Sequence, residues 1–292
     1  MKIIKYFIEF VSIISLFCIF KIIGLKNASN LGSVLGRYIG PYFRSKKVIK
    51  KNIKIAFGNI VKEKEAEIIN KTWSNIGRTF AEYIFLKDFR FNNINYDHIK
   101  INGSDYLTEI KKANEPVIFY SGHFANFELM AMELDKFGIK AAAIYRPLNN
   151  FLLNPIMEYL RRKYICPNQI PKGRMGMREI ISRVKDGCSI ALMVDQRVGE
   201  GLRIPFFNKP AHTTTVPAQL ALKYNCRLVP IFLERKEGIN FEMTVHEPYK
   251  IERTGNDEED TKKITLKINQ IIEQMIIKNP TQWIWSHNRW KK

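Results

Sequence analysis

Short apolar runs that alternate with helical segments constrain the fold of this chain more than any other feature. Four such runs, rich in Val, Ile, Leu and Ala, predict buried strands at 117–120, 141–145, 190–194 and 228–233. The segments between them predict helices over 127–137, 151–164, 174–186 and 214–224. This alternation predicts an α/β fold with a mainly parallel mixed sheet flanked by helices, and a site at the strand ends. The run 239–245 extends that sheet.

Two longer helices are predicted on either side of this alternating region. Apolar residues at three-to-four spacing predict a helix over 64–87, and a last helix is expected over 258–278. A polar connection near 88–100 joins the first of these helices to the alternating region.

The segment from Tyr6 to Leu25 is mostly apolar and rich in Ile and Phe, and its charged residues are Glu9 and Lys21. A spanning helix needs roughly 20 mostly apolar residues, so this one either spans with its charges near the interfaces or lies in the interface. A signal peptide or a buried core helix would also be apolar, but no small-x-small cleavage site follows Leu25. Residues 1–25 are therefore expected to form an N-terminal membrane-anchor helix.

Positive charge is concentrated directly after that segment. The chain carries 47 basic and 28 acidic residues, a net charge of +19, and residues 10–62 contain no acidic residue. Nucleic acid, an anionic membrane and an acidic protein are all compatible with this charge. A basic juxtamembrane segment at 26–62 places the main domain, 63–292, in the cytoplasm by the positive-inside rule. Ten basic residues fall within 10–62: Lys21, Lys26, Arg37, Arg44, Lys46, Lys47, Lys50, Lys51, Lys54 and Lys62.

The segment 120–128 follows a predicted strand, opens a predicted helix and contains His123 and Glu128. On one continuous helix these two side chains would lie roughly 140° apart. If Asn126 is the N-cap, His123 lies in the loop and Glu128 in the first turn, free to fold back toward the imidazole. A carboxylate on one ring nitrogen fixes the tautomer, so the other nitrogen can accept a proton. A loop histidine beside an ordinary helix N-terminal acid is the alternative.

Other catalytic patterns do not match. The sequence has no H-E-x-x-H, G-x-S-x-G or P-loop pattern, and its four cysteines form no C-x-x-C pair. A general base acting on an external nucleophile, with no metal or cofactor, therefore fits better than a metalloenzyme, a serine hydrolase or a nucleotide hydrolase.

Several sequence blocks occur in order along the chain. They are HFANFE at 123–128 with its H-x-x-x-x-E signature, YRP at 145–147, DQRVGEG at 195–201, IPFF at 204–207, the segment 210–215 and PTQWIWSHNRW at 280–290. Together with the N-terminal apolar segment, these blocks resemble the late acyltransferases of lipid A biosynthesis, the lauroyl and myristoyl transferases of the bacterial inner membrane. The resemblance covers nearly the whole chain, and Phe127 departs from it, since the family commonly has Trp there.

The resemblance implies transfer of a fatty acyl group, with lauroyl expected, from an acyl carrier protein thioester to a hydroxyacyl chain of a Kdo-bearing lipid A precursor. It also implies a glycerolipid acyltransferase-like fold for residues 63–292. His123 would take the hydroxyl proton, and Glu128 would orient the imidazole. A backbone N–H or a cationic side chain would stabilise the oxyanion.

The remaining expected site residues lie near predicted strand ends. Arg146, Asp195, Gln196 and Arg197 form the expected substrate-binding set, because guanidinium groups grip phosphate or carboxylate. The alternative for Arg146 and Arg197 is that they are ordinary surface arginines. Asp195 could instead cap the strand end or help to order the site. Rival functions are acyl transfer to another anionic glycolipid, such as a phosphatidylinositol mannoside, and a non-enzymatic basic protein that binds membrane or nucleic acid.

Aromatic residues close the chain. Trp283, Trp285, His287 and Arg289 alternate as on one face of an extended segment, which suggests either core packing or a membrane interface. Phe206 and Phe207 are expected to build core or an acyl-chain wall.

Overall fold

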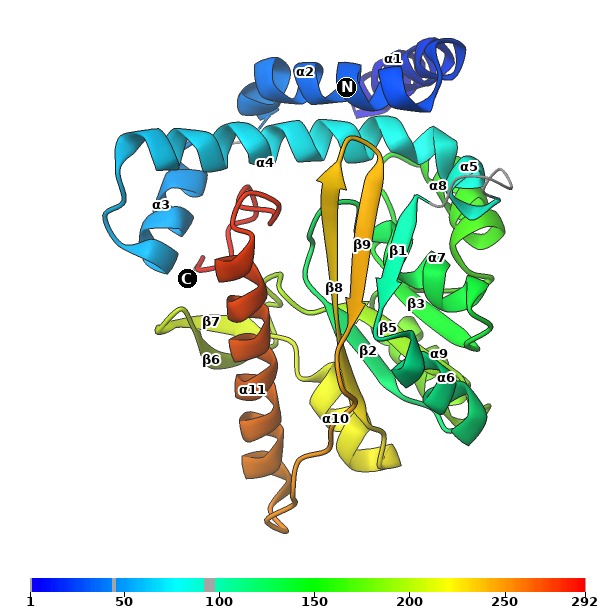
Figure 1. The fold of residues 1–292 in the computed structure, drawn as a ribbon, viewed down its shortest axis with the longest axis vertical. Coiled ribbons are helices and arrows are strands. Elements are labelled where there is room, and N and C mark those ends of the chain that lie inside the picture. The colour runs from blue at the N-terminus through cyan, green and yellow to red at the C-terminus, as the bar shows by residue number, and fades with distance from the viewer. Residues whose placement is uncertain (1, 44–45, 92–97, 292) are drawn as a thin grey trace.

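The computed structural model describes residues 2–43, 46–91 and 98–291, so Arg44 of the basic stretch lies outside the described residues. Figure 1 shows an α/β domain with helices α1, α2 and α4 laid across one end of its sheet. The seven-stranded sheet has the order β1-β9-β8-β2-β5-β3-β4, and a separate pair joins β6 to β7. Every neighbouring pair of the large sheet is parallel except β8 and β9. The predicted mainly parallel mixed sheet is confirmed.

The predicted strands correspond to β2, β3, β5, β8 and β9, whereas β1, β4 and the β6–β7 hairpin were not predicted. The missed strands are short and carry polar residues such as Asn102, Gln169 and His212, which hide the apolar pattern. The strand bounds are β1 Ile99–Asn102, β2 Ile118–Ser121, β3 Ala141–Tyr145, β4 Asn168–Pro171, β5 Ser189–Met193, β6 Leu202–Phe206, β7 Lys209–Thr213, β8 Leu228–Glu237 and β9 Asn240–Val245.

The predicted helices are also present, and α2, α3 and α6 were not predicted. The helix expected over 64–87 is divided into α4, the turn η1 and α5. The helix expected over 151–164 ends at Leu160 and continues as a π turn, η2, that carries Arg161. The helix bounds are α1 Lys2–Ile23, α2 Leu25–Phe43, α3 Lys46–Phe57, α4 Lys62–Glu82, α5 Leu86–Arg90, α6 Ser104–Ala113, α7 Glu128–Lys136, α8 Asn154–Leu160, α9 Arg174–Lys185, α10 Val216–Tyr224 and α11 Asp257–Lys278, with the 3₁₀ turn η1 Tyr83–Phe85 and η2 Arg161–Ile165.

The central strand β2 is buried on both faces, as parallel strands between two helical layers are. Ile118 and Tyr120 point into a core shared with α9, α10 and α11. Val117 and Phe119 point into a second core shared with α5, α6 and α7. Because side chains alternate along a strand, one short apolar run supplies both cores.

Helices α2 and α4 pack with their backbones in close approach. A Cβ on Gly77 would lie 1.9 Å from the carbonyl oxygen of Gly32, and one on Gly36 would lie 2.2 Å from that of Trp73. Helix α3 is tied to the C-terminal tail, where Asn52 donates to the carbonyls of Trp285 and His287. Residues 26–62 thus include two helices packed on the domain.

The C-terminal tail is buried and folded into turns. Trp283, Trp285 and Arg289 are at most 1% exposed, which favours core packing over the membrane interface. The expectation of an extended segment was wrong: the amide of Trp285 donates to the carbonyl of Trp283, closing a turn that fits the indoles into the core. Phe206 packs on the ring of Trp290 in the same core.

Candidate active site

His123 and Asp195 meet at the carboxyl edge of the sheet. Strands β2 and β5 are parallel neighbours whose register pairs Ser121 with Met193, and each site residue lies two positions beyond its strand. His123 Nδ1 is 2.7 Å from Asp195 Oδ1, and the His123 amide donates to Asp195 Oδ2 at 2.8 Å. The carboxylate therefore fixes both the ring and the backbone of His123.

The Asp195 side chain has no exposed surface. The indole Nε1 of Trp283 donates to its Oδ2 at 2.7 Å. Burial raises the pKa of Asp195, but the charge of His123 and hydrogen bonds from His123 and Trp283 outweigh burial and lower the pKa from 3.8 to about 2. Asp195 is therefore ionised at neutral pH, and it contacts His123 rather than lining the cavity described below.

The other ring nitrogen, Nε2 of His123, lies 3.3 Å from the side-chain nitrogen of Gln196. An amide NH₂ can only donate, and a carboxylate can only accept, so both neighbours favour a proton on Nδ1 and an unprotonated Nε2, whose lone pair accepts from Gln196. The ring of Phe127 packs edge-on against the imidazole, with centroids 4.6 Å apart. His123 is thus arranged to accept a proton through Nε2.

Glu128 begins α7, as expected, but its carboxylate bonds to a different partner than the predicted imidazole. Its Oε1 is 2.5 Å from Nη2 and 3.2 Å from Nε of Arg161. The physical reason is local: Arg161 is 11% exposed and needs a counter-charge, while Asp195 already occupies His123. Asn126 was expected to be the N-cap of α7, but the N-cap residue is Phe127. The side-chain amide of Asn126 donates to Glu82 instead.

Arg161 lies between two tyrosines. Its guanidinium carbon is 5.7 Å from the ring centre of Tyr83 and 5.1 Å from that of Tyr145. Burial alone would lower the pKa of Arg161, but Glu128 and the tyrosines outweigh burial and raise it. Among the described residues, its buried Nη1 has no hydrogen-bond partner. Arg161 is therefore a permanent cation, and its Nη1 group is available to donate a hydrogen bond.

A cavity of about 520 Å³ joins these groups, a volume typical of ligand pockets. His123, Glu128 and Arg161 contribute to its wall. Apolar side chains form much of the remainder: Met130, Ala131, Ile144, Ile165, Met177, Ile180 and Leu192. The cavity therefore combines polar groups with walls suited to an alkyl chain.

Three of the expected substrate-binding residues, Arg146, Gln196 and Arg197, line this cavity. Arg146 follows β3 and is exposed. The Arg197 amide donates to His287 Nε2, and its Nε donates to the carbonyl of Lys291. Sequence reasoning missed Arg161, because a basic cluster at a helix end is typical of solvated surface.

The chain is similar in sequence to proteins named as lipid A biosynthesis acyltransferases. It is 25% identical to a lipid A biosynthesis acyltransferase of Haemophilus influenzae over 84% of this chain and 76% of that protein. It is 22% identical to the lipid A biosynthesis lauroyltransferase of Escherichia coli, over 89% of this chain and 84% of that protein. The palmitoleoyltransferase of the same organism is 25% identical over the same shares.

The sequence model of one family matches residues 1–292, the full length of the chain. Members of this family are acyltransferases, in agreement with a histidine on the wall of a cavity that has both polar and apolar lining. The chain belongs to the bacterial lipid A biosynthesis acyltransferase family.

Proposed function

We propose that this enzyme transfers an acyl group, lauroyl as the expected chain, from an acyl carrier protein thioester to a hydroxyl of a Kdo-bearing lipid A precursor. The observation that carries the proposal is His123: its Nδ1 is 2.7 Å from a buried carboxylate, and the residue lines a cavity that has both polar and apolar walls. The position of His123, in the loop after the central parallel strand β2, also supports assigning the domain to the glycerolipid acyltransferase-like folds.

In this mechanism His123 Nε2 removes the proton of the acceptor hydroxyl as its oxygen bonds to the thioester carbonyl carbon. The tetrahedral intermediate collapses, the carbon–sulfur bond breaks, and the departing thiolate takes the proton from the imidazolium. The products are an ester and the free carrier thiol. Asp195 acts through His123, because its charge stabilises the imidazolium and its position keeps Nε2 available.

Arg161 is the group we assign to the negative charge that develops on the carbonyl oxygen. It lines the cavity, it is cationic, and within the described residues its Nη1 is unpaired. Glu128 keeps its place among the catalytic residues through this arginine, since two hydrogen bonds from Arg161 fix the guanidinium. The H-x-x-x-x-E signature then brings a base and an oxyanion site to one cavity.

The membrane helix and the cavity rim are physically joined. α1 is long and apolar enough to cross a membrane, and little of it is buried. Asn150, on the loop after Arg146, donates to the carbonyl of Tyr6 and to Glu9 on α1. Attachment through α1 would therefore hold Arg146 near the lipid headgroups, where it can meet an anionic acceptor.

This arrangement supports a bacterial inner-membrane enzyme whose catalytic domain faces the cytoplasm, where acyl carrier protein is available. The basic residues of α3 would strengthen its attraction to an anionic leaflet. Nucleic acid has no role in the proposal.

The test is transfer by purified enzyme from lauroyl carrier protein to a Kdo-bearing lipid A precursor in micelles, with the product identified by mass spectrometry. We expect His123→Ala to lower kcat by about 10²- to 10⁴-fold while the protein stays folded. His246→Ala is the matched control, because His246 follows β9 at the opposite edge of the sheet from the site. Near wild-type transfer by His123→Ala would remove the mechanism.

A further inference from the structure

We propose that a buried polar network centred on Glu82 and Arg235 positions the loop that carries His123. Glu82 is the last residue of α4, and Arg235 lies on β8. Their side chains are 0% and 8% exposed, and two hydrogen bonds of 2.5 and 3.0 Å join them. No atom of this pair lines the cavity, so any effect on the reaction passes through other residues.

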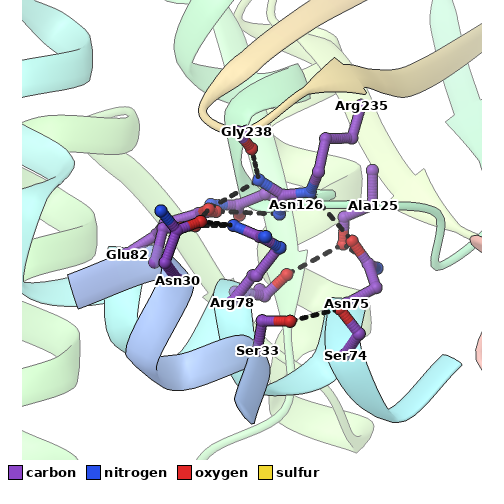
Figure 2. Close-up of polar contacts among 12 residues, drawn as sticks. Asn30, Ser33, Ser74, Asn75, Arg78, Glu82, Ala125, Asn126, Arg235 and Gly238 are labelled. Atoms are coloured by element: carbon purple, nitrogen blue, oxygen red, sulfur yellow. Dashed lines mark hydrogen bonds and ion pairs between the residues drawn. The ribbon is translucent and has the colours of Figure 1, made fainter. Parts of the chain in front are cut away.

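Two connections run from the pair to the loop, as Figure 2 shows. The Asn126 amide donates directly to Glu82 Oε2 at 3.0 Å. Arg235 Nε donates to Asn75 Oδ1 at 3.1 Å. The side-chain Nδ2 of Asn75 in turn donates to the carbonyl of Ala125 at 3.1 Å. Both chains of hydrogen bonds end on residues between His123 and Glu128.

Ala125 is the residue that needs this support. Its φ of +45° lies in the left-handed region, which is costly for a residue with a Cβ. Its carbonyl accepts a second hydrogen bond from Thr79, and its amide donates to the carbonyl of Gln282. The Gln282 side chain is bonded to the backbone of Arg235. These hydrogen bonds therefore hold the strained turn at Ala125, which lies between His123 and Glu128.

The network also reaches the helix that follows the membrane anchor. Ser29 on α2 donates to Glu82 at 2.7 Å, and Arg78 donates to Ser29 and Asn30 at 2.9 Å each. Hydrogen bonds thus connect α2, α4, β8 and the loop. Because a buried ion pair contributes little net stability compared with apolar packing, we assign this one to fixing geometry.

The experiment compares Glu82→Gln with Asp260→Asn. Both changes neutralise a buried carboxylate, but Asp260 bonds to Thr254 near the start of α11. We expect Glu82→Gln to lower kcat by about 10- to 100-fold with KM nearly unchanged, because the base is displaced. Asp260→Asn should lower Tm and leave kcat within about twofold of wild type, as expected for a site outside the catalytic geometry.

A second substitution separates positioning from general stability. Glycine adopts the left-handed conformation without the Cβ penalty, so Ala125→Gly in the Glu82→Gln background should recover kcat about threefold or more, whereas Ala125→Gly in the Asp260→Asn background should leave kcat unchanged. Thr79→Val, which removes a single donor to the Ala125 carbonyl, should reduce kcat even if Glu82→Gln fails to fold.

The activity readout rests on the proposed function, so hydrogen exchange of the Ala125 amide provides an independent one. We expect faster exchange in Glu82→Gln and Thr79→Val but not in Asp260→Asn. An inactive wild-type enzyme would reject the proposed function and leave the exchange test standing. Wild-type kcat and wild-type exchange in both network variants would overturn the inference.

Discussion

Two carboxylates at the candidate site act in different ways. Asp195, which is fully buried, bonds to the imidazole of His123, and Glu128, which is 11% exposed, bonds to the guanidinium of Arg161. A carboxylate on an imidazole selects a tautomer and leaves a base, whereas a carboxylate on a guanidinium holds a fixed cation. The comparison separates proton transfer from charge stabilisation, although one short motif, 123–128, contributes a residue to each pair.

Asp195→Asn should have the largest effect on this comparison. An asparagine amide that donates to Nδ1 would move the proton to Nε2 and remove the base, so we expect kcat to fall by about 10²- to 10⁴-fold. Stopped-flow or product assays at saturating substrates would measure it. Asparagine can still accept from Trp283, so folding should persist; wild-type turnover in a folded variant would show that Asp195 does not set the tautomer.

Glu128→Gln and Arg161→Lys should come next. Removing a group that stabilises an oxyanion costs about 10²- to 10³-fold in kcat at most, and lysine retains the charge but loses the planar fork, so Arg161→Lys should lose less than Arg161→Ala. Steady-state kcat of the three variants gives the order. Equal activity of wild type and Arg161→Ala would exclude the arginine from the oxyanion site.

Arg146→Ala should act on the acceptor rather than on the chemistry. Arg146 is exposed at the rim, where an ion pair contributes up to ~1 kcal/mol, so we expect KM for the lipid acceptor to rise about fivefold with kcat unchanged. Arg197→Ala should behave similarly. Initial rates in micelles at several acceptor concentrations would measure this; a fall in kcat alone would place the arginines in the chemical step instead.

The basic surface of α3 should matter least in detergent. Charge reversal of Lys46, Lys47, Lys50 and Lys51 should weaken vesicle binding, since each lysine near an anionic leaflet contributes about 1 kcal/mol. Micellar turnover should change only about twofold, and wild-type vesicle binding should weaken as salt shortens the screening length to about 3 Å at 1 M. Loss of micellar turnover with vesicle binding intact would reverse this assignment.

Local patterns were sufficient for the strands that carry the site, but not for their neighbours in space. The run before His123 and the run before Asp195 both predict strands, and the two residues are 72 positions apart. Only the pairing of β2 with β5 places them together, and that order depends on how helices cover the sheet. The periodicity of apolar residues along the chain carries no information about the order of the strands in the sheet.

The partner of Glu128 was missed for a related reason. The sequence places His123 in the loop before a helix and Glu128 in its first turn, so Glu128 is the carboxylate nearest to the imidazole along the chain. Arg161 comes from a π turn that periodicity does not distinguish from the end of an ordinary helix. Burial then decided the pairing, because an enclosed guanidinium requires a carboxylate.

The most direct test of the account is the tautomer of His123, measured from the ¹⁵N chemical shifts of its ring in the neutral state. The account predicts a proton on Nδ1 in the wild type and in Glu128→Gln, and a shift of that proton toward Nε2 in Asp195→Asn. A tautomer that changes in Glu128→Gln and stays the same in Asp195→Asn would contradict the assignment of Asp195 as the residue that orients the base.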